Sequence, residues 1–218
     1  LQIVKELDTA MTEMRKVSQD TQQQLDDFAK SSHKVAQEIG TTAVTIQNSA
    51  ADWMRLGYNI KDAAELSKNT SILMNVSEFE SIDAATESMV AMVQAFKDTN
   101  NDVGKLSLEI IDKLNNIGNN FSISTSELAE SLKRSSGTLI AAGNSLDEAI
   151  ALTTAANAII QDPESTGSAL KVISMRIRGT SAKELENEGD EIPIDLILAQ
   201  IKKLSDQDYI KYALPILD

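Results

Sequence analysis

The sequence predicts an all-α fold, in which a long N-terminal, coiled-coil-like helix is followed by a bundle of about six shorter antiparallel helices. Apolar residues recur at the three- and four-residue spacings of an amphipathic helix through most of the chain. Several of these segments begin with a capping residue and end at Gly or Asn. Aromatic residues make up only 4% of the 218 residues, so we expect a core of Leu, Ile, Val, Met and Ala.

The long helix is predicted over residues 1–56, because positions spaced alternately by four and three residues form a continuous seam. The five hydroxyl residues in this seam weaken it, and Gly40 allows a bend. A solvated helix that docks on partners therefore fits the pattern as well as a homomeric coiled coil does. The seam consists of Leu7, Met11, Met14, Ser18, Thr21, Leu25, Phe28, Ser32, Val35, Ile39, Thr42, Ile46, Ser49 and Trp53.

Two capping boxes mark helix starts further along the chain. Each has a Ser followed three residues later by a Glu, so that each side chain can accept the free backbone N–H of the other residue. They are Ser124 with Glu127 and Ser145 with Glu148. The first predicts a helix over residues 125–141 that ends at Gly143, and the second starts the segment LDEAIALTTAANAII.

The remaining helices follow from similar start and stop signals, and together they predict a core domain over residues 57–180. Residues 181–218 are predicted to be a charged linker followed by a C-terminal helical segment, IDLILAQIKKL. One of the other predicted helices starts at Asn59 with Asp62, and the next runs from about Ser81 to Phe96. A third lies near 106–117 and stops at Gly118. The last starts at Asp162-Pro163 and stops at Gly179.

A weak internal repeat relates two of these helix starts. The stretch from Gly57 to Leu66 resembles the stretch from Gly143 to Leu152 at an offset of 86 residues. Duplication would explain the likeness. We prefer the simpler interpretation that capped amphipathic helices with Ala at the fourth position look alike.

Composition excludes several classes of function. With 20 basic and 33 acidic residues the net charge is −13, which argues against binding to a phosphate backbone as the main task. Cys is absent, so the chain has neither disulfides nor thiolate metal sites. A His-based zinc site or a Ser-His-Asp triad would depend on His33, which lies in a polar helical stretch.

No apolar run approaches the roughly 18 residues that a membrane span needs, and no signal peptide opens the chain. The chain begins with Leu rather than Met, so we expect it to be a piece of a longer protein.

Two patterns come close to known chemistry. Asp98, Asn100, Asp102 and Glu109 occupy positions 1, 3, 5 and 12 of a calcium-binding loop. The sixth position, which needs Gly for its sharp turn, is Val103, and the apolar eighth position is Lys105. We therefore prefer a polar loop between helices, and we predict no metal or cofactor.

The second pattern is Ser168 with Lys171, the S-x-x-K spacing of a lysine-activated serine nucleophile. Its companion motifs, S-D-N and K-T-G, are missing. Lys171, Arg176 and Arg178 are more simply interpreted as cations in the last turns of a helix. We predict no catalytic residue and no enzymatic activity.

Between about residues 50 and 180 the chain contains an ordered series of short motifs: LGY, IIDKLN, GNNF, AAGN, IIQDP and MRIRG. With this series, the region resembles the core region of phage tail tape-measure proteins. The seam from Leu7 to Trp53 is similar to the helical coil that flanks this region in the family.

The resemblance implies a structural protein of a phage or prophage tail. Such a protein takes part in tail assembly, sets tail length and leaves the tube during genome delivery. Its implied partners are tail tube subunits, tail assembly chaperones, baseplate or tail-tip proteins, and further copies of itself. Its implied location is the virion tail, after the host cytoplasm during assembly. No tight nucleic-acid binding and no membrane span are expected in this piece.

A long helix can set tail length, because its fixed rise per residue makes its length proportional to the number of residues. The region after Gly57 is compact and interrupted by Gly, which is unlike a ruler. We therefore expect a folded assembly or end-anchoring module, with the length-setting coil mainly outside these residues. A bacterial helical signalling or scaffolding bundle is the alternative; it fits the composition but does not account for the ordered motifs.

Overall fold

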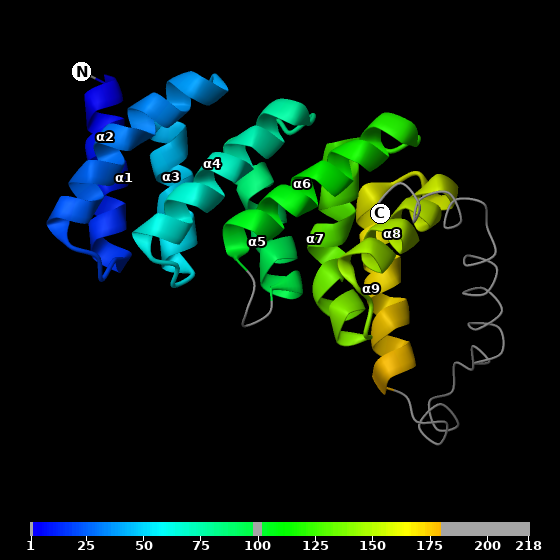
Figure 1. Ribbon diagram of the computed structural model, residues 1–218. Helices are drawn as coiled ribbons and strands as arrows, with labels where there is room; N and C mark the ends of the chain where they lie inside the picture. The colour runs from blue at the N-terminus through cyan, green and yellow to red at the C-terminus, as the bar shows by residue number, and fades with distance from the viewer. Residues whose placement is uncertain (1, 98–101, 180–218) are drawn as a thin grey trace. The chain divides into compact units, whose positions relative to one another are not determined.

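The computed structural model describes residues 2–97 and 102–179, and every regular element in them is an α-helix (Figure 1). The predicted all-α class is confirmed. The helices of the described residues are α1 (Gln2–Val17), α2 (Gln22–Ile39), α3 (Ala43–Arg55), α4 (Ile60–Val76), α5 (Ile82–Phe96), α6 (Val103–Asn120), α7 (Thr125–Ala141), α8 (Leu146–Ile160) and α9 (Pro163–Gly179).

The chain divides into two compact units within α6. Unit 1 contains α1 to α4, α5 up to Val93, and α6 up to Ile111. Unit 2 contains residues 94–96, α6 from Asp112, and α7 to α9. The predicted linker and C-terminal helix at 181–218 lie outside the described residues.

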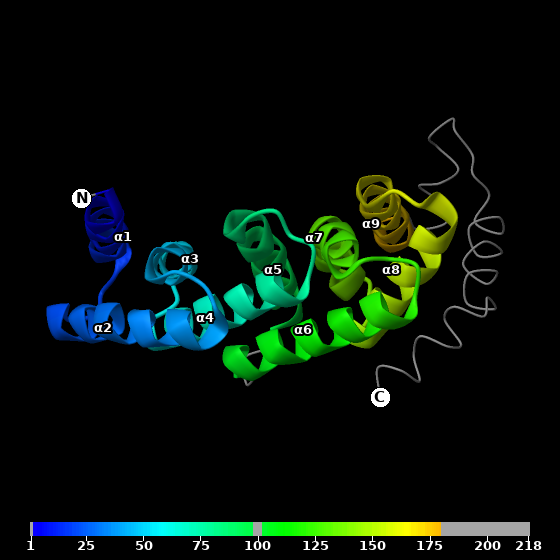
Figure 2. The same ribbon diagram turned by 90° about the horizontal axis from the view of Figure 1, so that it is seen from above.

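Unit 1 is built in two layers of helices. Figure 2 shows α1, α3 and α5 in one row, with α2, α4 and the first half of α6 in the other. Neighbours within a row are joined by buried polar contacts: the Ser49 and Thr86 hydroxyls lie 3.2 Å apart between α3 and α5. Between α4 and α6, the Asn69 side chain donates to the Gly104 carbonyl at 3.1 Å and to the Ser107 hydroxyl at 2.7 Å. These bonds join α5 to α3 and α6 to α4.

Unit 2 is centred on the contact between α7 and α9, and α8 packs against both. The Lys113 ammonium, on the second half of α6, pairs with the Asp147 carboxylate in the first turn of α8. Each unit has its own buried core. The largest fully buried side chains are Met14, Ile46, Trp53, Leu66, Leu73, Met89, Met92 and Ile110 in unit 1, and Leu114, Ile117, Leu128 and Leu132 in unit 2.

The prediction of one long helix over residues 1–56 is wrong, because two turns divide this stretch into α1, α2 and α3. At the first turn, Thr21 Oγ1 accepts the Gln24 backbone N–H at 3.3 Å, and Gln24 Oε1 accepts the Thr21 N–H at 2.8 Å. This is a capping box that starts α2. At the second turn, Gly40 ends α2 with φ +74°, and Thr42 caps α3. The three helices pack against one another.

The hydroxyl residues of the predicted seam explain why the helix is interrupted. Three of them, Ser18, Thr21 and Thr42, lie in the two turns. The other two, Ser32 and Ser49, are buried and hydrogen-bonded to a neighbouring helix. The seam therefore combines helix caps with buried contacts between helices.

Most of the helix starts predicted after residue 57 are confirmed. Asn59, Ser81, Ser124 and Ser145 each accept a backbone N–H three residues later, and the Ser124 and Ser145 capping boxes are complete. The predicted stop at Gly118 is wrong, because α6 continues to Asn120. A Cβ atom on Gly118 would lie 2.5 Å from Thr125 Oγ1, so this glycine allows close packing instead of ending the helix.

The turns after α3 and α7 have the same conformation. Gly57 and Gly143 have φ +91° and +94°, and each follows a residue with φ −85°. In both turns the glycine N–H and the next N–H donate back to the last turn of the preceding helix, the pattern of a Schellman motif. All the corresponding positions differ by 86, so the sequence offset relates two equivalent turns.

Candidate functional site

The calcium-loop pattern is only partly within the described residues, since Asp98 and Asn100 lie outside them. Asp102 Oδ1 accepts the backbone N–H groups of Gly104 at 3.0 Å and Lys105 at 3.2 Å, so its carboxylate caps α6. Glu109 is exposed on α6. Within the residues that the structure describes, no group of three or more His, Cys, Asp or Glu could hold a metal ion.

The other residues with candidate chemistry lie on exposed helix surfaces. His33 is exposed on α2, and Ser168 and Lys171 are exposed on α9. A lysine that activates a serine nucleophile needs a buried site or a cationic neighbour. The structure therefore supplies no environment that would activate Ser168.

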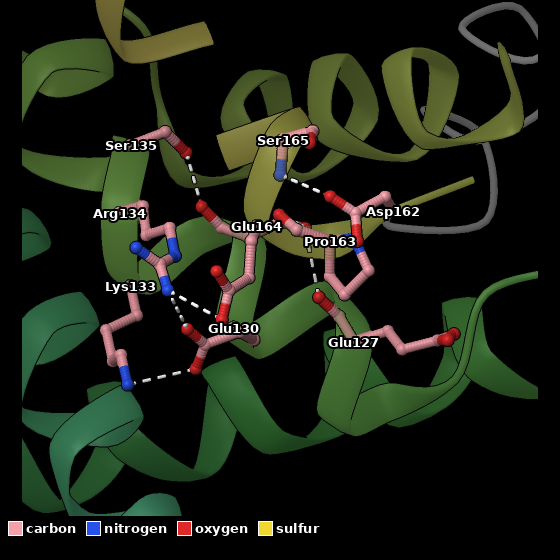
Figure 3. Close-up of polar contacts among 10 residues, drawn as sticks. Glu127, Glu130, Lys133, Arg134, Ser135, Asp162, Pro163, Glu164 and Ser165 are labelled. Atoms are coloured by element: carbon pink, nitrogen blue, oxygen red, sulfur yellow. Dashed lines mark hydrogen bonds and ion pairs between the residues drawn. The ribbon is translucent and has the colours of Figure 1, made fainter. Parts of the chain in front are cut away.

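In unit 2, α7 and α9 pack closely against each other, and Figure 3 shows polar contacts between them. Gly167 of α9 faces α7 so closely that a Cβ atom there would lie 2.5 Å from the Ser131 carbonyl oxygen and 2.9 Å from Arg134 Cβ. The Ser131 hydroxyl lies 2.9 Å from the Pro163 carbonyl oxygen, to which it donates across the two helices. Small residues on both helices thus permit a backbone-to-backbone approach.

Charged side chains border this contact. Arg134 pairs with Glu130 at 3.2 Å on its own helix and with Glu164 of α9 at 3.0 Å (Figure 3). Lys133 pairs with the other Glu130 oxygen at 2.9 Å. These four side chains form a network of opposite charges around the two helices, which suits a structural junction.

Asp162 starts α9 as predicted, with Pro163 at the first helical position. Its carboxylate accepts the Ser165 backbone N–H at 2.7 Å. Hydrogen bonds from the Ser165 side chain and backbone hold the pKa of Asp162 below its usual range. The α7–α9 contact thus combines a capped helix start at Asp162, an ion pair between the two helices and close packing at Gly167.

In unit 1, α1, α3 and α5 line an open groove with a volume of about 610 Å³. Its charged residues are Glu13, Asp52, Arg55, Asp83 and Glu87, which are four acids and one base. We call this surface the acidic groove. A second hollow of similar volume lies along α1 and α3 and shares Thr9 and Asn48 with it.

Arg55 is the central cation of the acidic groove. It pairs with Glu13 at 3.2 Å and with Asp52. Hydrogen bonds from Lys16 and Arg55 lower the pKa of Glu13. Burial raises the pKa of Asp52, and the nearby carboxylates of Asp83 and Glu87 add to that rise, against the opposing effect of Arg55.

The groove has the features of an interaction surface. Its walls include apolar side chains, such as Val90 and the 46% exposed Leu56, and its rim is acidic. Sequence reasoning missed it because its residues come from three helices, and Asp52 and Asp83 are 31 positions apart. The only available signal was Asp83 with Glu87, which are one helical turn apart.

None of the described helices is long and apolar enough to cross a membrane. The chain matches the sequence profile of a family described as phage-related minor tail protein, over residues 29–208. This range contains α3 to α9 and most of α2. No solved structure matches the chain.

Proposed function

The chain belongs to the phage-related minor tail protein family, and from this premise we propose that it is part of a tail tape-measure protein. In this role it acts in tail assembly and in the determination of tail length, and it has a part in genome delivery. The family supports a structural role in a phage tail. The ordered motifs between residues 50 and 180 support the finer assignment.

The proposed partners are tail tube subunits, tail assembly chaperones and baseplate or tail-tip proteins, with assembly in the host cytoplasm. The role requires no catalytic step. The net charge of −13 supports it, because an acidic surface does not hold DNA that passes through the tube. A bacterial signalling or scaffolding bundle, the alternative, does not explain membership of a phage tail family.

We further propose that this part of the protein is an assembly or end-anchoring module. The observation that supports this is the folding back of the chain: the described helices span only 13 to 18 residues each and pack against one another. A straight helix converts residue number into distance at about 1.5 Å per residue. A chain that reverses at short capped turns does not.

The first test is the location of the protein. Mass spectrometry of separated, purified tails should find the tryptic peptide Ser135–Lys171. Its presence at a few copies per tail would support the tail assignment. Its absence from tails, with the peptide found in infected or induced cells, would contradict a virion role.

The second test separates anchoring from measuring. Deletions of increasing length within residues 60–180 should prevent tail assembly or leave tail length unchanged, because they remove parts of packed units. Matched deletions in flanking coil-forming parts of the full-length protein should shorten tails by about 1.5 Å per residue. If deletions within 60–180 shorten otherwise normal tails in that proportion, as seen by electron microscopy, the anchoring proposal fails.

A further inference from the structure

The outer surface of α9 has a composition that complements the acidic groove. The side of α9 that packs on α7 and α8 contains the buried Thr166, Leu170 and Ser174. The opposite side contains two exposed apolar side chains, Val172 at 47% and Met175 at 54%. These two side chains form a small exposed apolar patch on one face of the helix.

Two cations flank these apolar residues. Lys171 and Arg176 are exposed on the same side of α9 as Val172 and Met175, since 3.6 residues per turn place all four within an arc of about 140° around the helix. We call these four residues the α9 face. It is apolar at its centre and basic at its edges, whereas the acidic groove is apolar along its walls and acidic at its rim.

The charges at both surfaces include groups that remain available to a partner. Arg55 pairs with Glu13 and Asp52, so the cation of the groove is already engaged. Within the described residues, neither Asp83 nor Lys171 forms an ion pair. Asp83 lines the acidic groove, so its carboxylate can pair with a cation of a docked partner.

We propose that the α9 face of one copy docks into the acidic groove of another copy, so that chains associate head to tail. The contact is a helix in a groove, with Val172 and Met175 against the apolar walls and Lys171 and Arg176 toward the carboxylates at the rim. It joins two different surfaces, so it is heterologous, and it extends into a filament or closes into a ring, the smallest of which is a reciprocal pair of chains. It requires no particular placement of the two units within one chain.

The inference goes beyond the tape-measure proposal and does not depend on it. It concerns how copies of this chain associate, whichever structural role they have in the tail. Its test is made in solution with purified protein, so its failure would leave the tail assignment untouched.

The experiment measures the mass of the full 218-residue chain by sedimentation velocity over a wide range of concentration and at low and high salt. The average mass should rise with concentration and fall with salt, because ion pairs at the rim are screened. The double variant Lys171→Glu/Arg176→Glu should associate about tenfold more weakly or worse, and so should Asp83→Lys/Glu87→Lys. An equimolar mixture of the two variants should recover association, because each reversed surface then meets its complement.

Matched controls separate the contact from net charge. Lys30, Lys34, Asp27 and Glu38 are exposed on α2, outside both surfaces. Lys30→Glu/Lys34→Glu and Asp27→Lys/Glu38→Lys therefore reverse as many charges as the two test variants, and they should associate as the unmodified chain does. Far-UV circular dichroism and urea unfolding curves check that all variants fold. Met175→Ser provides a second variant that weakens the contact without changing charge.

Three results would overturn the proposal. The chain could remain monomeric at every concentration, which would also be the result if the α9 face were covered within its own chain. Association could be unaffected by both double variants. Each double variant could lose association while their mixture fails to recover it, in which case the two surfaces do not meet each other.

Discussion

Gly167 and Gly137 lie on the neighbouring helices α9 and α7, but their missing side chains have opposite effects. A Cβ atom at Gly167 would lie 2.5 Å from the Ser131 carbonyl oxygen, whereas nothing lies within 4 Å of one at Gly137. We expect Gly167→Ala to lower the free energy of unfolding by about 1–3 kcal/mol, because α7 and α9 must separate. Gly137→Ala should raise it by up to about 1 kcal/mol through helix propensity.

Urea unfolding followed by circular dichroism measures both variants against the unmodified chain. Gly137→Ala is the matched control, since it makes the same substitution in a helix of the same unit. Equal effects of the two substitutions would mean that the close α7–α9 approach does not determine the stability of unit 2.

At the residue scale, the sequence predicts contacts between residues that are a few positions apart. It does not predict contacts between residues that are far apart in the chain. The Ser124–Glu127 box was predicted because three residues separate its members. The same pattern at Thr21 and Gln24 lies inside the predicted apolar seam, so heptad spacing alone does not indicate the helix start there. Asp20 accepts the backbone N–H of Ile60, 40 positions away, and no spacing rule predicts that bond.

At the element scale, the turns after α3 and α7 predict equal effects of equivalent substitutions. Gly57→Ala and Gly143→Ala should each lower the free energy of unfolding by about 1–2 kcal/mol, because each glycine has φ above +90° and open space around it. The cost is therefore conformational and not steric. Trp53 is the one Trp of the chain and is buried in unit 1, so its fluorescence reports the first variant and circular dichroism reports both.

The corresponding Asn substitutions serve as controls, since Asn tolerates positive φ better than Ala does. Each Asn variant should be less destabilised than its Ala counterpart. If the Ala substitution lowers the free energy of unfolding greatly in one turn and not in the other, the two turns do not contribute equally to stability despite their common geometry.

The helix prediction for residues 1–56 failed for a reason that belongs to this scale. Heptad spacing predicts which residues are buried, and Met14, Leu25, Phe28, Ile46 and Trp53 are indeed buried. It does not distinguish one long helix from several short helices that bury the same positions against one another. The distinction depends on Gly40 and on hydroxyls that cap instead of packing.

The acidic groove also could not be predicted, because it exists only where α1, α3 and α5 come together. Its residues are ordinary surface acids when each helix is considered alone. The motif-based candidates showed the opposite problem: Ser168 and Lys171 match a catalytic spacing, but they lie on an exposed helix surface. A match to a catalytic motif therefore does not predict a site unless the packing of the helices around the matching residues is known.

At the scale of the whole molecule, the chain forms two compact units that divide α6 between them, and the last residues of α5, 94–96, also belong to unit 2. Each unit has a separate core, so we expect the units to unfold with different stabilities. Leu66 in unit 1 and Leu132 in unit 2 are both fully buried, and truncation of a buried Leu to Ala costs about 2–5 kcal/mol. Leu66→Ala should lower the urea midpoint of Trp53 fluorescence, whereas Leu132→Ala should lower the midpoint of part of the circular dichroism change.

The informative comparison is the fluorescence of Leu132→Ala. If each unit is stabilised mainly by its own core, loss of packing in unit 2 leaves the Trp53 midpoint close to that of the unmodified chain. If α6 instead couples the units into one cooperative structure, both variants lower both midpoints together. The second result would contradict the division of the chain at Ile111, and it would make α6 the element through which a partner bound to one unit stabilises the other.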